Sequence, residues 1–425
     1  MSRMPPPVRR PVFRGFASSV ALALSLAAGS VVATAALSSP AMAQRQQKPN
    51  NSKAFAEAYQ PVADIVNGGG DVSGVKAQLP AIVNVIETPD DRYSAGNLVL
   101  LVGNKLSDKA LQRQGLELMV ESGKVDPAQL GQLQFFIGSL AYEAQDWAVA
   151  RTALQAALTA GYTEEGPEGL IAESYFKEGQ NQQGLTYLKD LIAKRKTAGQ
   201  QVPESWILRG LQVAYQAQLT DAATEWSAML VAQNPSSENW IKALQVINST
   251  AVADDPQTRL DLLRLMALTD SLSDRREFIT YIETADPRIM ANEVATVLDA
   301  GKRAGVFSDG DEYYTDVKRV VDQRAPADRA EAPKLATEAR GAANGRAAQN
   351  AGDVFLSLGS YAEAEEMYAL ALEKGGVDRD QMLTRLGISQ VHQNKYAEAR
   401  TTFGQVAGAR APVARMWTAY VESRA

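Results

Sequence analysis

The sequence contains no cysteine and only one histidine, His392, among 425 residues. Without cysteine the chain cannot form disulfides, thiolate metal sites, a thiol nucleophile or the acyl anchor of a lipoprotein. One histidine cannot build a multi-histidine metal site, and no serine elbow or phosphate-binding glycine loop accompanies it. We therefore predict no catalytic, cofactor-binding or metal site, and we expect His392 to be solvated or to line a groove.

Long apolar runs are also missing after residue 40, where runs such as Leu98–Val102 span only a few residues. Such a run is far too short to cross a bilayer, so we expect no stable membrane insertion of the mature chain. Adjacent carboxylate pairs such as Glu365 and Glu366 point about 100° apart on a helix, which is typical of solvated faces and not of acid–base pairs.

Residues 1–43 differ from the rest of the chain. They combine four arginines, an Ala-rich apolar stretch at Phe16–Leu37 and the small residues Ala41-Met42-Ala43 before Gln44. This order predicts a cleaved secretory signal peptide, followed by a flexible stretch at 44–50; an uncleaved anchor helix is the alternative. We expect a periplasmic protein that is not a lipoprotein, with the general and twin-arginine export routes both open.

The charge balance excludes one class of partner. The chain has 43 basic and 49 acidic residues, a formal charge of −6, and loss of the four signal-peptide arginines makes it −10. An acidic chain repels phosphate backbones, so we predict no nucleic-acid binding.

Helix-forming residues with helical apolar spacing and short Gly, Pro or Asn breaks dominate the chain after residue 50, which predicts an all-α fold. The tetrapeptide YAEA occurs at Tyr361 and again at Tyr396. Alignment on it defines a unit of about 34 residues with small residues at positions 8 and 20 and larger ones at position 24. Positions 8, 20 and 24 in five such units are Gly138, Ala150 and Leu154; Ala172, Gly184 and Leu188; Gly210, Ala222 and Trp226; Gly352, Ala364 and Tyr368; and Gly387, Ala399 and Phe403.

Two small residues allow two helices to approach closely where they cross, and a bulky residue fills the flank. We expect positions 8 and 20 to face each other. The spacing resembles the tetratricopeptide repeat, as found in exported bacterial proteins of that family. The resemblance implies a right-handed α-solenoid of antiparallel helix pairs.

The repeat template matches the chain unevenly, and we divide the sequence accordingly. We expect a repeat-like solenoid at 51–248, degenerate helical pairs at 249–323, a loosely packed Ala- and charge-rich joint at 324–344, and two further repeats with a capping helix at 345–425.

In the repeat family, the first helices of successive pairs line a concave groove. The resemblance places these candidate groove residues there: Phe135, Tyr142, Phe176, Ile207, Leu211, Tyr215, Arg346 and Asp353. Some members hold a C-terminal carboxylate with Lys and Asn at positions 5 and 9, but here Gln349 and Asp353 stand at those positions. That carboxylate clamp is therefore not expected.

The sequence favours a noncatalytic periplasmic scaffold that binds protein or peptide partners of envelope assembly, secretion or division. A polysaccharide-binding module of an export system is the first alternative. The second is a peptidoglycan-acting helical-superhelix enzyme, although such enzymes append a compact catalytic domain and here the repeats run almost to Ala425. Partner identity and oligomeric state stay open.

Overall fold

A computed structural model describes residues 49–164, 166–252 and 255–424. The predicted signal peptide and most of the predicted flexible stretch at 44–50 lie outside these residues. Every regular element in the described residues is a helix, which confirms the all-α prediction. None of these helices is both long enough and apolar enough to pass through a membrane.

The described part of the chain divides into two compact units: unit 1 ends at Tyr187, and unit 2 begins at Leu188. The helices of unit 1 are α1 (Lys53–Asn67), the short 3-10 helix η1 (Lys76–Gln78), α2 (Leu79–Val83), α3 (Pro89–Leu106), α4 (Lys109–Glu121), α5 (Pro127–Glu143), α6 (Trp147–Thr159) and α7 (Pro167–Lys177). Helix α8 (Asn181–Thr197) contains the division between the units.

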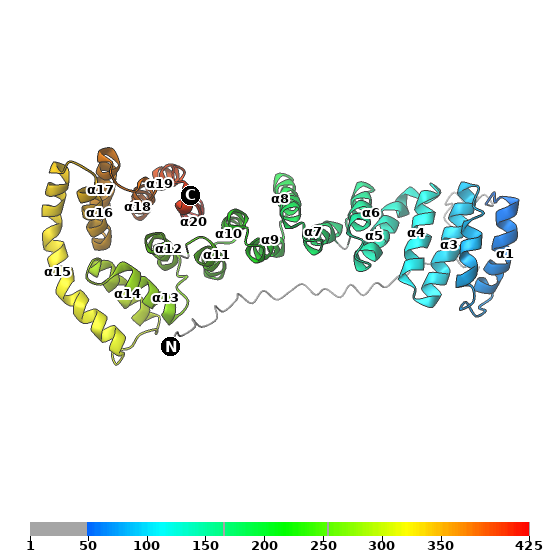
Figure 1. The fold of residues 1–425 in the computed structure, drawn as a ribbon, viewed down its shortest axis with the longest axis horizontal. Helices are drawn as coiled ribbons and strands as arrows, with labels where there is room; N and C mark the ends of the chain where they lie inside the picture. Colours follow the sequence, from blue (N-terminus) through cyan, green and yellow to red (C-terminus); the bar gives the residue numbers. More distant parts are fainter. Residues whose placement is uncertain (1–48, 165, 253–254, 425) are drawn as a thin grey trace, which may run out of the picture. The chain divides into compact units, whose positions relative to one another are not determined.

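Unit 2 continues the succession of helices (Figure 1). They are α9 (Glu204–Gln216), α10 (Thr220–Gln233), α11 (Ser237–Thr250), α12 (Pro256–Leu268), α13 (Arg275–Ala285), α14 (Ala291–Arg303), α15 (Glu312–Gly341), α16 (Arg346–Leu358), α17 (Tyr361–Lys374), α18 (Arg379–His392), α19 (Tyr396–Phe403), the 3-10 helix η2 (Gly408–Arg410) and α20 (Ala411–Glu422). Consecutive helices pack against each other throughout this list, as in a helical-repeat solenoid.

Short polar side chains mark where many of the helices begin. Thr88 accepts a hydrogen bond from the Asp91 amide, while Asp91 accepts one from the Thr88 amide, which closes a capping box at α3. Asp108, Asp255 and Asp378 accept bonds from the first free amides of α4, α12 and α18 in the same way. These local signals explain why the chain breaks into short helices.

Close packing at glycine holds the helix pairs together, although not as the template predicted. A Cβ atom built on Gly138 would lie 2.6 Å from Leu154 Cγ, and one on Gly352 would lie 2.7 Å from the Tyr368 ring. Gly387 has the same relation to Phe403, at 2.5 Å. The residue over each glycine is therefore the one at position 24, sixteen residues later, whereas we expected position 20.

Close helix packing at glycine also occurs between α3 and α4, a pair that the repeat template did not match. Helices α3 and α4 cross so closely that a Cβ on Gly96 would lie 2.7 Å from the Gly115 carbonyl oxygen. One on Gly115 would lie 2.5 Å from the Leu100 amide nitrogen. The backbones of α3 and α4 are in direct contact here, because neither Gly96 nor Gly115 has a side chain to separate them.

In unit 2 the last helix packs against helices from the first part of the unit. Helix α20 packs against α10, α11 and α12, and α12 also packs against α18. The rings of Trp240 in α11 and Tyr420 in α20 lie 6.2 Å apart. One apolar core therefore extends from Ala228 to Val421, and Met416, Trp417 and Tyr420 of the predicted capping helix lie inside it.

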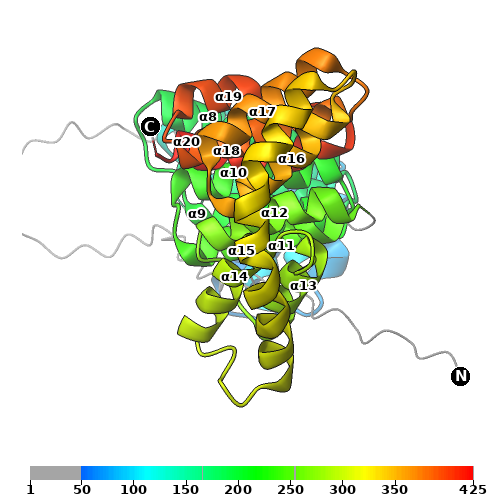
Figure 2. The same ribbon diagram turned by 90° about the vertical axis from the view of Figure 1, so that its left-hand side faces the viewer.

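The predicted joint at 324–344 is wrong for most of its length, because residues 312–341 form the single helix α15. Pro326 and Pro333 lie inside it, and α15 bends along its length (Figures 1 and 2). Ala332, Ala336 and Ala339 are buried in the unit 2 core, so this segment is packed.

Replacing Gly210 with Ala should destabilise the protein by about 1–3 kcal/mol, because the new Cβ would lie 2.5 Å from Trp226 Cδ2 and the buried indole must move. Gly169→Ala is the matched control: Gly169 also lies in a helix, but nothing approaches its Cβ position within 4 Å. Urea unfolding of both variants measures the difference. Equal stability of the two variants would contradict the proposed packing role.

Candidate interaction groove

The first expected groove residue of unit 1 belongs to the core. Phe135 in α5 is 1% exposed, and its ring lies 5.0 Å from that of Tyr162. A buried ring offers no surface to a partner, so its assignment to the groove is corrected here. The helical pattern could not separate the rings that fill the helix–helix interface from those that face outward.

Tyr142 and Phe176 keep part of their rings at the surface. Tyr142, at the end of α5, packs edge-on against Trp147, the first residue of α6, with ring centroids 5.2 Å apart. Phe176 lies against the backbone of α8, since a Cβ on Gly184 would be 2.7 Å from its Cδ1 atom. Phe176 therefore supports the hairpin as well as the surface, and the Tyr142–Trp147 pair is the better candidate contact.

The unit 2 candidates in α9 divide in the same way. Ile207 and Leu211 stand one helical turn apart and are both 0% exposed, so their assignment to the groove is corrected. Tyr215, one further turn along, is partly exposed and stays a prediction.

The C-terminal helix pairs present a groove that their own chain fills. Ser357 in α16 and Thr384 and Ile388 in α18 occupy groove positions of the repeat template, and each is at least nine-tenths buried. The amide of Glu293 in α14 donates a 3.1 Å hydrogen bond to Ser357 Oγ. Of the two predicted groove residues here, Arg346 is exposed, but Asp353 accepts hydrogen bonds from Arg385 and Tyr368, both at 2.7 Å.

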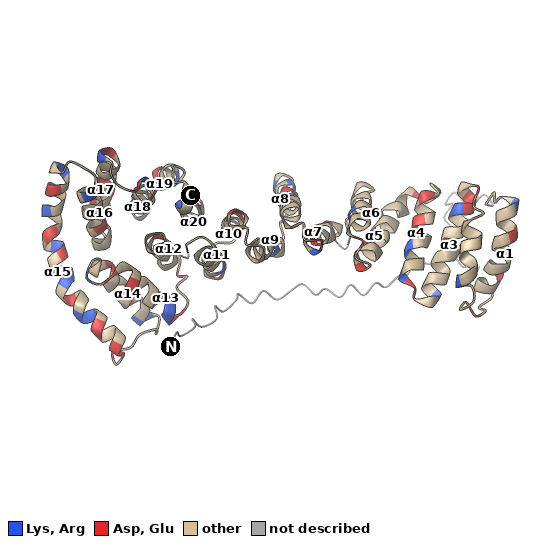
Figure 3. Cartoon of the chain, viewed as in Figure 1, with Lys and Arg blue, Asp and Glu red and all other residues tan. Residues whose placement is uncertain are grey.

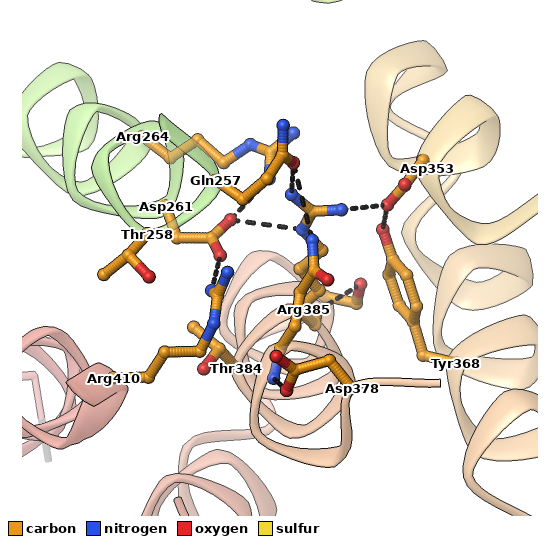
Figure 4. Close-up of polar contacts among 12 residues, drawn as sticks. Gln257, Thr258, Asp261, Arg264, Asp353, Tyr368, Asp378, Thr384, Arg385 and Arg410 are labelled. Atoms are coloured by element: carbon orange, nitrogen blue, oxygen red, sulfur yellow. Dashed lines mark hydrogen bonds and ion pairs between the residues drawn. The ribbon is translucent and has the colours of Figure 1, made fainter. Parts of the chain in front are cut away.

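Helix α12 supplies the centre of this packing. Its Asp261 is fully buried and contacts three arginines (Figure 4), which we call the Asp261 cluster: Arg264, Arg385 and Arg410. Asp261 Oδ1 accepts from Arg264 Nη1 at 2.7 Å and from Arg385 Nε at 3.3 Å, and Oδ2 accepts from Arg410 Nη1 at 2.7 Å. Trp417 Nε1 donates to the Asp261 carbonyl oxygen at 3.0 Å.

Additional carboxylates balance the buried arginines. Arg264 makes two 2.8 Å bonds to Glu293 in α14, which also accepts from the Tyr281 hydroxyl at 2.8 Å. Burial opposes ionisation of Glu293, but the charge and hydrogen bonds of Arg264 outweigh it and hold the glutamate pKa below its usual value. The guanidinium of Arg385 keeps its proton. Burial lowers its pKa, but the negative charges of Asp353 and Asp261 raise the pKa by more than burial lowers it.

No prediction from the sequence included this cluster. Arg385 and Arg410 lie 124 and 149 residues beyond Asp261, so no local spacing connects them. One signal was available: in α12, Asp261 and Arg264 interrupt a run of Leu and Met, and a helix that is apolar on all sides is buried. Charges inside such a run require buried partners.

His392 lies in the same filled groove. Its ring stacks on Tyr361 with centroids 4.2 Å apart and planes 5° from parallel. Burial, followed by the positive charge of Arg264, lowers the His392 pKa to about 4, although Glu293 opposes the shift. The imidazole is therefore neutral near pH 7, and of the two settings expected for His392, solvated or lining a groove, the structure shows the second, in a groove that the chain itself fills.

No group of three His, Asp or Glu side chains in the described residues is arranged to hold a metal ion. No protein-family model matches the sequence. No curated protein matches it either. Among solved structures, a chain of the Naa15/Naa10 complex bound to HypK-THB aligns at 13% identity, with a TM-score of 0.26.

That alignment covers 84% of this chain, but this chain spans only 64% of the length of the other. The fold assignment rests on the helices described above, and no function is drawn from so distant a likeness.

Replacing Asp261 with Asn should destabilise the protein by about 3–5 kcal/mol, because it leaves buried arginines without their shared negative charge. The matched control is Asp322→Asn, which removes an exposed i,i+4 pair with Lys318 and should change stability by at most about 0.5 kcal/mol. Guanidinium unfolding followed by tryptophan fluorescence measures both. An Asp261 variant as stable as the control would contradict the assigned role.

Below pH 6.5 the unfolded chain protonates His392, whereas the folded chain does so only near pH 4. Unfolding therefore takes up a proton in this window, and stability falls as the pH falls, by about 3 kcal/mol in total from this group. The variant His392→Gln should lose correspondingly less stability between pH 7 and pH 4. Urea unfolding at intermediate pH values tests this, and parallel curves for the two proteins would refute it.

Proposed function

We propose that the chain is a noncatalytic, exported scaffold of tetratricopeptide type that binds protein or peptide partners through unit 1. The observation that carries this is the contrast between two first-helix surfaces. In the C-terminal pairs the groove positions are covered by α12 and α14 of the same unit, whereas in α5 the Tyr142 ring stays partly exposed. The accessible aromatic surface of the predicted groove in unit 1 is therefore the better site for a partner.

The surroundings of Tyr142 suit a binding hot spot. Trp147 holds the ring edge-on, and two ion pairs flank it: Lys109 with Glu143, and Arg113 with Asp146 at 3.1 Å. A fixed aromatic pair with charged neighbours can anchor an apolar side chain while the charges select its orientation. Such a surface fits an amphipathic helix or an extended peptide.

The compartment and pathway belong to the same proposal. The basic, apolar and small-residue order of residues 1–43 supports export and cleavage before Gln44, and the absence of cysteine fits an unlipidated periplasmic protein. The partners would then be envelope proteins of assembly, secretion or division. Sequencing the N-terminus of the protein recovered from the periplasmic fraction tests this, and an intact Met1 in the cytoplasmic fraction would contradict it.

Tyr142→Ala should weaken partner capture at least about tenfold, as expected for loss of an aromatic anchor, with only a small change in thermal stability. The matched control is Tyr396→Ala, which removes another partly exposed tyrosine, in unit 2. A photo-crosslinking residue at each position, followed by mass spectrometry from intact cells, identifies the partner, and titration of the purified partner measures the affinity.

Equal affinities of the two variants would overturn the proposed surface. Recovery that depends only on glycan would favour polysaccharide binding, and release of soluble muropeptides from peptidoglycan would overturn the noncatalytic assignment.

A further inference from the structure

A shallow cleft of about 470 Å³ lies where the loop between α13 and α14 approaches the start of α15. Its apolar lining comes from Pro287 in the loop and from Tyr313, Val317 and Val320, which stand on one stripe of α15. Glu312 and Asp316 form a charged edge on the neighbouring stripe. Val317 is buried in the core of unit 2, whereas Tyr313 and Val320 on the same stripe are only partly buried and leave apolar surface at the cleft.

The loop that contributes Pro287 to the cleft carries further exposed apolar surface. Ile289, two residues after Pro287, is 61% exposed, and among the described residues only Ile65 is another large aliphatic residue with comparable exposure, at 39%. The loop is held in place, because the amides of Ile289 and Met290 both donate to the Asp286 carbonyl oxygen at 2.9 Å. Ile289 therefore adds exposed apolar surface to the same loop that supplies Pro287 to the cleft.

Tyr313 adds a rigid aromatic wall. Its ring stacks on Phe307 with centroids 6.1 Å apart, and its buried hydroxyl forms no hydrogen bond within the described part of the chain. Burial, and then the negative charge of Glu283, raises the Tyr313 pKa to about 12, so the phenol stays neutral.

The charge that remains at the cleft is negative. The basic residues on its rim are already paired, since Arg319 contacts Asp316 at 3.1 Å and Arg288 contacts Asp286 at 2.8 Å. Glu283 and Glu312, by contrast, form no ion pair with another described residue. Figure 3 shows acidic and basic residues interspersed along the ribbon of α15.

We propose that this cleft is a docking site for a short basic peptide segment of a partner protein, with an aliphatic or aromatic anchor beside one or two Lys or Arg residues. The anchor would lie on Val317, Val320 and Ile289, and the cations would face Glu283 and Glu312. Charge complementarity argues against a second copy of this acidic chain as the occupant. The cleft lies in unit 2 and is independent of the Tyr142 surface.

Selection from a displayed random 12-residue peptide library on the full chain tests the proposal. Recovered peptides should combine an apolar anchor with Lys or Arg. Their affinity should fall at least about tenfold for Ile289→Asp and for the double variant Glu283→Gln with Glu312→Gln, and it should also fall as salt is raised. Ile65→Asp is the matched control and should bind as the unchanged chain does.

Three results would overturn the proposal: a selection that yields no basic apolar peptide, peptides that bind the cleft variants with unchanged affinity, or a dimer in sedimentation that Ile289→Asp dissociates. The substituted residues are exposed at the surface, so unfolding curves of all three variants should match that of the unchanged chain.

Discussion

The arrangement of unit 2 depends on one buried carboxylate. Asp261 is removed from water, and three arginines that come from α12, α18 and η2 share its charge. A buried ion is tolerated only when its hydrogen bonds are complete. A packing that misplaced α18 or η2 would therefore leave several buried charges without an ion-pair partner. Because buried ion pairs contribute modest net stability, we infer that the cluster acts mainly by making competing packings of these similar helices unfavourable. The apolar core around it supplies the larger part of the folding free energy.

Because unit 2 packs its own helices over the groove of its C-terminal pairs, a resemblance to the repeat family does not by itself predict which of its residues bind a partner. A groove position is read from its place on the first helix of a pair, but its accessibility depends on what else the chain packs there. Ser357 and Thr384 stand at groove positions and are covered by elements that precede them by many residues in the sequence. Function therefore cannot be transferred from the template to this unit position by position.

The features that sequence analysis predicted are those with a local cause. Helical apolar spacing predicted the all-α fold, and Gly352 was predicted to allow a close approach within its hairpin, although Tyr368 at position 24, and not Ala364 at position 20, lies over it. The Asp261 cluster has no such signature, because its members meet only after the whole unit has formed. The aromatic residues are an intermediate case: helical spacing puts Phe135 and Tyr142, seven residues apart, on the same face of α5, but which ring is buried depends on the packing of Tyr162 and Trp147.

Where the C-terminal helix pairs fill their own groove, partners can be contacted only through the outer faces of these pairs, and this sets the kind of recognition available there. The cleft at α15 is small and shallow, and its rim charges are solvated, so an occupant gains little from area alone. Affinity at such a site must come from one or two well-fitted anchors, and specificity from the sign of the charge around them. Tyr142 with Trp147 in unit 1 follows the same rule with an aromatic pair in place of an aliphatic patch. Scattered small contact surfaces of this kind suit a scaffold that holds several partners loosely better than a single deep pocket would.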